Sequence, residues 1–171
     1  MNPNEENSYE ILKKDHIFEN FVKIVNGKKE PITLEDLRDG VKNIQLSQNV
    51  PDEVKEIFEI SKRLFIFGYF YYRFFTVSQH YAFLALESAL RNKYKELFNV
   101  SDKKLEEINL KNIIDKLAKR GIIAEDKKSL YDAGRDLRNA LSHLTQRKVL
   151  TPDAVILERT AEMINKLFTE S

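Results

Sequence analysis

The sequence contains no cysteine, and only five glycines and four prolines among its 171 residues. Without cysteine the chain forms no disulfide, offers no thiolate to a metal ion and has no cysteine nucleophile. Because glycine and proline mark turns, their scarcity favours a few long helices over many short strands. A chain of this length is sufficient for one domain with a substantial hydrophobic core.

An excess of charge of either sign is also missing. Lys and Arg together number 28 and Asp and Glu 27, which gives a formal net charge of +1. A strongly basic balance is typical of nucleic-acid-binding domains, so any such binding here has to come from a local patch. The first nine residues are polar and acidic and lack the basic and apolar regions of a signal peptide, and we therefore expect a cytoplasmic protein.

Long hydrophobic runs are missing as well. The most apolar stretch, residues 64–75, reads LFIFGYFYYRFF and spans only twelve residues. A membrane-spanning helix needs about 20 apolar residues. We therefore interpret this stretch as a buried helical segment or a protein interface, and we expect no membrane as a partner. A membrane-surface role is the alternative interpretation.

The first 50 residues predict an extension that is partly helical and to which we assign no function. A short helix is expected over residues 9–25, followed by a turn at Asn26-Gly27. A second helix is expected to begin after Thr33, whose hydroxyl suits an N-cap, and to end near Ile44.

Residues 51–171 predict a helical bundle. Residues 51–98 are too many for one helix of a compact domain, so we expect a turn near residues 68–72. The expected helices lie at residues 51–67 and 70–98, before the C-cap Gly121, at residues 126–146, and from residue 151 onward. The predicted fold class is all-α, an antiparallel bundle of four to five core helices preceded by the N-terminal extension.

The helix expected at residues 126–146 carries its apolar side chains on one arc of the helical wheel, which includes Leu130, Gly134 and Leu137. Its polar residues outside this arc include Arg135, Arg138, Asn139, Ser142 and His143. We therefore expect the polar residues to face solvent or a partner instead of the protomer's own core.

Residues 137–143, which read LRNALSH, resemble the signature of the HEPN family of helical ribonucleases. In that signature an Arg is followed after four to six residues by a His, and a polar residue stands next to the Arg. The segment ALES at residues 85–88 and the order of the helices also resemble the family, and the resemblance covers about residues 51–168. It implies a metal-independent endoribonuclease in which Arg138 and His143 are catalytic. Supporting roles are assigned to Asn139, Ser142 and Glu87.

These residue types suit the cleavage of RNA without a metal ion. His143, with an ordinary imidazole pKa of about 6.5, can take a proton from the attacking 2′-OH or give one to the leaving 5′-oxygen at neutral pH. Arg138 carries a permanent charge and a planar set of donors for phosphate oxygens. Asn139 lies one turn before His143, where it can orient the imidazole or hydrogen-bond the substrate.

The resemblance also implies partners. Family proteins commonly form homodimers in which two such helices face each other across a cleft, so we expect a homodimer with RNA as its substrate. We also expect a role as a toxin or phage-defence effector, with an antitoxin protein as a further partner. No Gly-rich phosphate loop, Ser-His-Asp pattern or metal-ligand spacing is visible in the sequence, so we predict no cofactor.

Other interpretations of the same residues stay open. One is a non-catalytic HEPN-like module that binds RNA or protein through the same face, and another is a purely structural helical dimer. A further interpretation is that Arg138 and His143 are ordinary surface residues, with Arg138 paired to Glu or Asp. Arg135 is expected in a salt bridge, and His80 as a hydrogen-bonded histidine within the bundle. Glu87 and Arg91, four residues apart, first predict an intrahelical ion pair.

Overall fold

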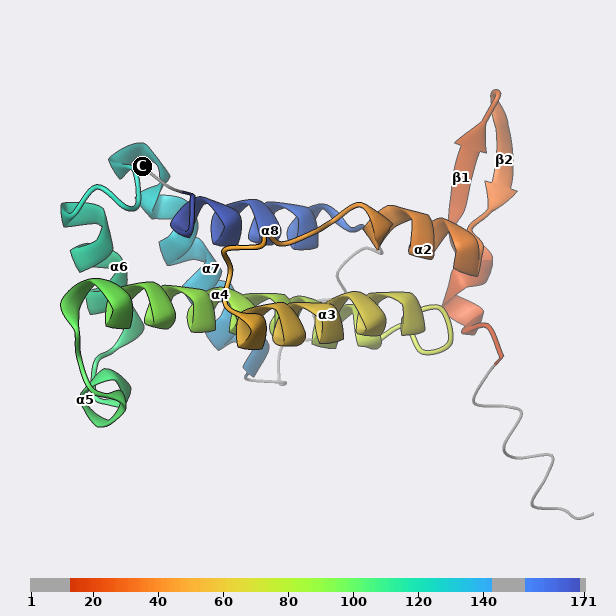
Figure 1. The fold of residues 1–171 in the computed structure, drawn as a ribbon. Coiled ribbons are helices and arrows are strands. Elements are labelled where there is room, and N and C mark those ends of the chain that lie inside the picture. Colours follow the sequence, from red (N-terminus) through yellow and green to blue (C-terminus); the bar gives the residue numbers. More distant parts are fainter. Residues whose placement is uncertain (1–12, 143–152, 170–171) are drawn as a thin grey trace, which may run out of the picture.

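The structure of the protein is a computed structural model that describes residues 13–142 and 153–169 (Figure 1). Most of these residues are helical, and one short two-stranded sheet accompanies the helices, which confirms the predicted all-α helical bundle. The helices are α2 (Leu34–Lys42), α3 (Asp52–Phe67), α4 (Phe74–Phe98), α5 (Asp102–Glu106), α6 (Leu110–Lys119), α7 (Lys128–Ser142) and α8 (Val155–Leu167). The smaller elements are η1 (His16–Asn20), β1 (Val22–Val25), β2 (Lys28–Pro31) and η2 (Glu125–Lys127). Among the described helices, none is both long enough and apolar enough to cross a bilayer.

Helix α4 is the central helix of the bundle (Figure 1). It packs most extensively against α3 and also contacts α8, α7 and α6. Its residues Ala82, Ala85 and Ala89 are fully buried, and their small side chains let neighbouring helices approach closely. Leu90 and Tyr94 continue the buried side of α4 toward its C-terminus. Helix α4 therefore supplies the surface on which α7 and α8 are held.

The turn between α3 and α4 lies where the sequence predicted it. A Cβ atom on Gly68 would lie 2.6 Å from the ring of Phe75, which is itself buried, so only glycine fits at the end of α3. Helix α4 begins at Phe74, four residues later than expected. Within the α3–α4 interface, the hydroxyl of Ser61 donates to the carbonyl of Ser78 at 2.7 Å, and the hydroxyl of Ser78 donates to the carbonyl of Ser61 at 2.8 Å.

The helix expected over residues 9–25 is wrong for its last residues; of the described part, only the short 3-10 helix η1 is helical. Residues 22–25 form strand β1, which pairs antiparallel with β2. Asn26 and Gly27 both have positive φ angles, of 50° and 78°, which is the backbone geometry of a tight two-residue hairpin turn. The turn at this position was predicted, but the β-branched residues of β1 that complete a hairpin signal were not used.

Helix α2 begins as the sequence predicted. Thr33 is its N-cap: the Thr33 hydroxyl accepts from the Asp36 amide at 3.2 Å, and the Asp36 carboxylate accepts from the Thr33 amide at 2.8 Å. Asp36 also accepts a 2.7 Å bond from the ammonium of Lys23 on β1. The hairpin is therefore attached to the start of α2 by a charged hydrogen bond.

Candidate functional site

The candidate site lies where α7 crosses α4. The Arg138 guanidinium, on α7, has its Nη2 atom 3.0 Å from Oε2 of Glu87, on α4. The side chain of Arg138 is 33% exposed and that of Glu87 is 15% exposed. The structure thus brings together two of the residues singled out from the sequence. The expectation that Arg138 faces solvent is only partly right, because its guanidinium contacts Glu87 of α4 and is partly buried there.

The reason is the rotation of α7 about its own axis. Leu130 and Leu137, expected to face the core, are 47% and 45% exposed. Gly134, expected on the same arc, is buried as predicted, and so is Tyr131, which was not expected there. A Cβ atom on Gly134 would lie 3.1 Å from Cδ2 of Leu86, so the missing side chain lets α7 approach α4 closely. The side of α7 that faces α4 therefore runs through Tyr131 and Gly134 toward Arg138.

Glu87 is shared by two arginines. Its Oε1 atom accepts from Nε of Arg91 at 2.9 Å, which confirms the predicted intrahelical pair. The Nη1 atom of Arg91 also donates to the carbonyl oxygens of Leu105 and Ile108, at 3.0 and 3.2 Å. The hydrogen bonds of Arg91 thus attach the C-terminal end of α5 to α4. Two cations on one carboxylate leave this cluster with a net positive charge.

His80 lies two helical turns before Glu87 on the same helix. Its Nδ1 atom is buried and has no hydrogen-bond partner among the described residues, so the prediction of a hydrogen-bonded histidine is wrong. Burial lowers the pKa of His80 below the ordinary imidazole value, and the positive charge of Arg138 lowers it further. His80 is therefore neutral at neutral pH. Sequence reasoning missed this neighbour of Arg138, because its position depends on how α7 lies on α4.

The other candidates of α7 differ in their surroundings. Asn139 is exposed, and its Oδ1 atom accepts from Nη1 of Arg138 at 3.2 Å. Arg135 forms ion pairs with Asp132 and Asp136, at 3.3 and 2.7 Å, which confirms its predicted salt bridge. Ser142 is the last residue of α7. Its side chain and the whole of His143 lie outside the described residues.

A groove of about 510 Å³ with both charged and apolar lining residues opens beside Arg138. Residues of α3, α4, α5 and α7 line it, and they include three acids and three bases. These charged residues are Glu53, Glu87, Asp102, Arg91, Lys95 and Arg138. The groove thus presents charges of both signs and no uninterrupted basic surface, in keeping with the near-zero net charge of the chain.

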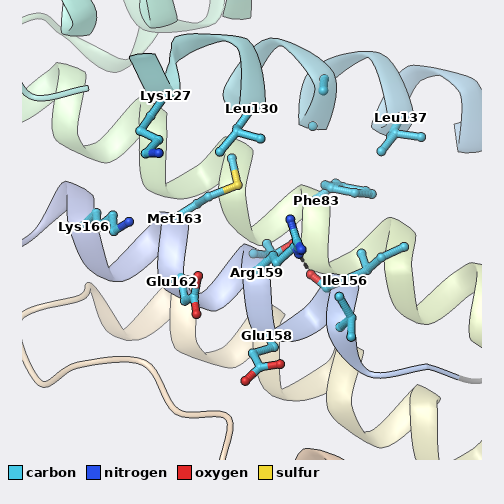
Figure 2. A pocket seen from close by; sticks show the side chains of 14 residues that line it. Phe83, Lys127, Leu130, Leu137, Ile156, Glu158, Arg159, Glu162, Met163 and Lys166 are labelled. Carbon is cyan, nitrogen blue, oxygen red and sulfur yellow. Dashed lines mark hydrogen bonds between the residues drawn. The ribbon is translucent and has the colours of Figure 1, made fainter. Parts of the chain in front are cut away.

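A second groove, of about 630 Å³, lies between α7 and α8 (Figure 2). Leu130 and Leu137 of α7 line one wall, with Leu130 directed toward Met163 of α8 (Figure 2). Lys127 and Lys166 lie together at one end of the groove. Most of the lining surface is apolar, and charged residues of α8 such as Arg159 and Glu162 also line it, a composition typical of surfaces that bind an amphipathic protein segment.

Comparisons of the chain with models of protein families, with curated proteins and with solved structures find no match. The HEPN resemblance therefore rests on residues 137–143 and on the helices around them. Within the part of the chain that the structure describes, no three His, Asp or Glu side chains are grouped to hold a metal ion.

Proposed function

We propose that the chain is a metal-independent endoribonuclease of the HEPN type, in which Arg138 and His143 act on the scissile phosphodiester of RNA. The observation that carries the proposal is the Arg-Asn-x-x-x-His run of the sequence at residues 138–143, together with the position of its arginine on α7. Arg138 lines an open groove, and an acidic side chain of the preceding long helix holds it there. A homodimer and a role in toxin–antitoxin or phage-defence systems belong to the same proposal.

In this mechanism the 2′-oxygen attacks phosphorus and the bond to the 5′-oxygen breaks. One proton leaves the 2′-OH and one reaches the 5′-oxygen, so the products are a 2′,3′-cyclic phosphate and a 5′-OH. His143 makes one of these proton transfers, and His143 of a second copy or a water molecule makes the other. Arg138 stabilises the negative charge that develops on the phosphoryl oxygens in the transition state.

Glu87 acts as a positioning residue in this proposal. A carboxylate paired with Nη2 restricts the rotation of the Arg138 guanidinium and aims it across the groove. Asn139 restrains the same guanidinium through Nη1. An ion pair on Nη2 and a hydrogen bond on Nη1 together restrain the guanidinium, and electrostatic catalysis requires such preorganisation before the substrate arrives.

Cleavage of structured RNA by the purified protein in the presence of EDTA tests the proposal. We expect products with 2′,3′-cyclic phosphate ends, and we expect Arg138→Ala and His143→Ala to abolish them. Arg135→Ala is the matched control, since Arg135 is an arginine of the same helix whose ion pairs among residues 13–142 and 153–169 are with Asp132 and Asp136 of α7 itself. Circular dichroism establishes that all three variants keep their helices. Activity retained in the Arg138 and His143 variants contradicts the proposal.

The second candidate function is a non-catalytic module that binds a protein or RNA. The apolar groove between α7 and α8 favours it, because Leu130, Leu137 and Val155 are each at least 40% exposed there. The pairing of Arg138 with Glu87 also favours it, because Arg138 already has an acidic partner within the chain and its charge is partly compensated. This function predicts no cleavage by the wild type. Salt-sensitive binding of RNA would indicate a nucleic-acid partner, and binding that salt hardly weakens would indicate a protein.

A further inference from the structure

The hairpin of β1 and β2 projects from the helical bundle (Figure 1). Its register pairs Val25 with Lys28 across the two-residue turn, and then Lys23 with Glu30. In an antiparallel ladder, residues that exchange hydrogen bonds alternate with residues whose backbone groups point outward. With a two-residue turn, Val25 and Lys28 exchange backbone hydrogen bonds with each other. By the alternation, Lys23 and Glu30 are the next pair that exchanges hydrogen bonds. The 3.3 Å bond from the Ile32 amide to the Phe21 carbonyl continues this alternation.

The backbone groups of Val22 and Ile24 therefore point to the outer edge of β1. Those of Lys29 and Pro31 point to the outer edge of β2. Proline has no N–H group, so Pro31 prevents regular pairing along the edge of β2. The edge of β1 carries no such block, and no described residue outside the hairpin forms a backbone hydrogen bond with Val22 or Ile24. The two edges thus differ in their capacity to accept another strand.

The side chains on the open edge strand are apolar and exposed. Ile24 is 65% exposed, the largest fraction for any large apolar side chain in residues 13–142 and 153–169. Val22 is on the same face and is 45% exposed. A two-stranded sheet is marginally stable alone and gains stability from further strands.

The open edge is complementary to a second copy of itself. When two β1 strands pair antiparallel about an axis at Lys23, Val22 of one copy lies opposite the partner's Ile24. Both residues direct their N–H and C=O groups outward, so each such pair exchanges bonds, which gives about four new backbone hydrogen bonds. Each apolar side chain then has an apolar neighbour on the opposite strand. This arrangement is an isologous contact, the usual form of a twofold dimer.

The two copies of Lys23 meet at this axis, where like charges repel. The structure removes that obstacle, because the Lys23 ammonium is 2.7 Å from the Asp36 carboxylate on the other face of the hairpin. Hydrogen bonds from Lys23 and Thr33 lower the pKa of Asp36 to about 2, so the carboxylate is charged whenever Lys23 is charged in ordinary buffers. In each copy, Asp36 therefore compensates the charge of Lys23, which reduces the repulsion between the two lysines at the axis.

We propose that two copies of this chain pair through the outer edge of β1 and form a four-stranded antiparallel sheet. The proposal does not depend on the ribonuclease activity, since the hairpin contains no residue of the α4–α7 site. Pairing through a strand of four residues buries less surface than a standard protein–protein interface, whose lower limit is about 1,200 Å². The dimer is therefore weak, with an expected dissociation constant on the order of 100 µM.

Sedimentation-velocity ultracentrifugation of the full chain, from about 5 to about 500 µM, tests the pairing at concentrations around this constant. We expect the sedimentation coefficient of the wild type to rise with concentration. Ile24→Pro removes an N–H group that the hairpin itself does not use, so it should leave the fold intact and remove the part of the rise that pairing through β1 causes, whether the unit that associates is a monomer or a dimer joined through α7. Lys29→Pro is the matched control: it removes an outward N–H group from the edge of β2 and should leave association unchanged.

Introduced thiols test the register, since the chain has no cysteine of its own. A mixture of the V22C and I24C variants should form an intermolecular disulfide faster than either variant alone, because these positions lie directly opposite each other. Absence of self-association up to the highest concentration overturns the proposal. Association that Ile24→Pro leaves unchanged overturns it as well, and places the contact elsewhere, for example in the groove between α7 and α8.

Discussion

Replacing Glu87 by Gln tests the α4–α7 site most directly. The carboxylate lies 2.9 Å from Arg91 and 3.0 Å from Arg138, and the amide keeps its shape while removing its charge. A charge-assisted hydrogen bond contributes about 1.5–3 kcal/mol, and breaking a fully buried ion pair costs about 3–5 kcal/mol. All three side chains are partly exposed, which reduces these values. We expect the free energy of unfolding to fall by about 2 kcal/mol.

Urea denaturation followed by circular dichroism measures this loss as a shift of the midpoint at constant slope. Glu59→Gln is the matched control: Glu59 lies on α3, is 51% exposed, and is 3.6 Å from both Lys62 and Arg63. Exposed pairs contribute little, so we expect the control to change stability by less than about 0.5 kcal/mol. Equal losses in the two variants would refute the conclusion that Glu87 anchors Arg138.

The same variant also bears on the proposed activity. If Glu87 aims the Arg138 guanidinium, Glu87→Gln should lower the cleavage rate by about tenfold, which corresponds to about 1.4 kcal/mol of transition-state stabilisation. The Michaelis constant should change less, because the orientation of Arg138 matters most when charge develops on the phosphate. An unchanged rate in the folded variant would restrict Glu87 to a structural role.

Further predictions concern the turn, the buried histidine and the cap of α2. Gly68→Ala should lower stability by about 2 kcal/mol in urea denaturation, because the new methyl group would overlap the Phe75 ring; a neutral effect would contradict this packing. The lowered pKa of His80 means that the unfolded chain binds its proton more readily, so stability should fall as the pH drops below about 6.5. His80→Gln should make that slope shallower, and an identical pH profile for the variant would exclude His80 as its cause. Thr33→Ala should cost about 1 kcal/mol through the lost cap of α2, and a thermal melt unchanged from wild type would argue against it. Protonation of Asp36, whose pKa is lowered to about 2, should destabilise the chain as the pH falls from about 4 toward 2, and Asp36→Asn should remove that part of the acid transition.

Much of the fold follows from local signals in the sequence. The cap at Thr33, the turn at Asn26-Gly27 and the break at Gly68 each depend on residues within a few positions, and each is observed where it was predicted. The hairpin was missed because the stretch before the turn was interpreted as a continued helix. Its alternating β-branched residues and the Asn-Gly pair form a stronger signal for a hairpin than for a helix.

The site was less accessible to sequence reasoning. The apolar arc predicted for α7 included Leu130, Gly134 and Leu137, but only Gly134 of these three is buried, and Tyr131, which lies outside that arc, is buried beside it. Counting apolar residues centres the inward side on the leucines, whereas the packed side is centred on Tyr131 and Gly134, because Gly134 allows close contact with Leu86 of α4. That rotation brings Arg138 to Glu87 and to His80. A single sequence does not contain this information, because it depends on how two helices separated along the chain fit together.

The reciprocal hydrogen bonds of Ser61 and Ser78 have a consequence for how α3 and α4 align. An interface of alkyl and aromatic groups alone can slide by one helical turn and still bury a similar apolar area. Here such a shift would leave two fully buried hydroxyls without partners, at a cost of about 1–3 kcal/mol each. Two small polar side chains thus select one alignment of α4 along α3. That alignment also determines which residues of α4 contact α7 and α8.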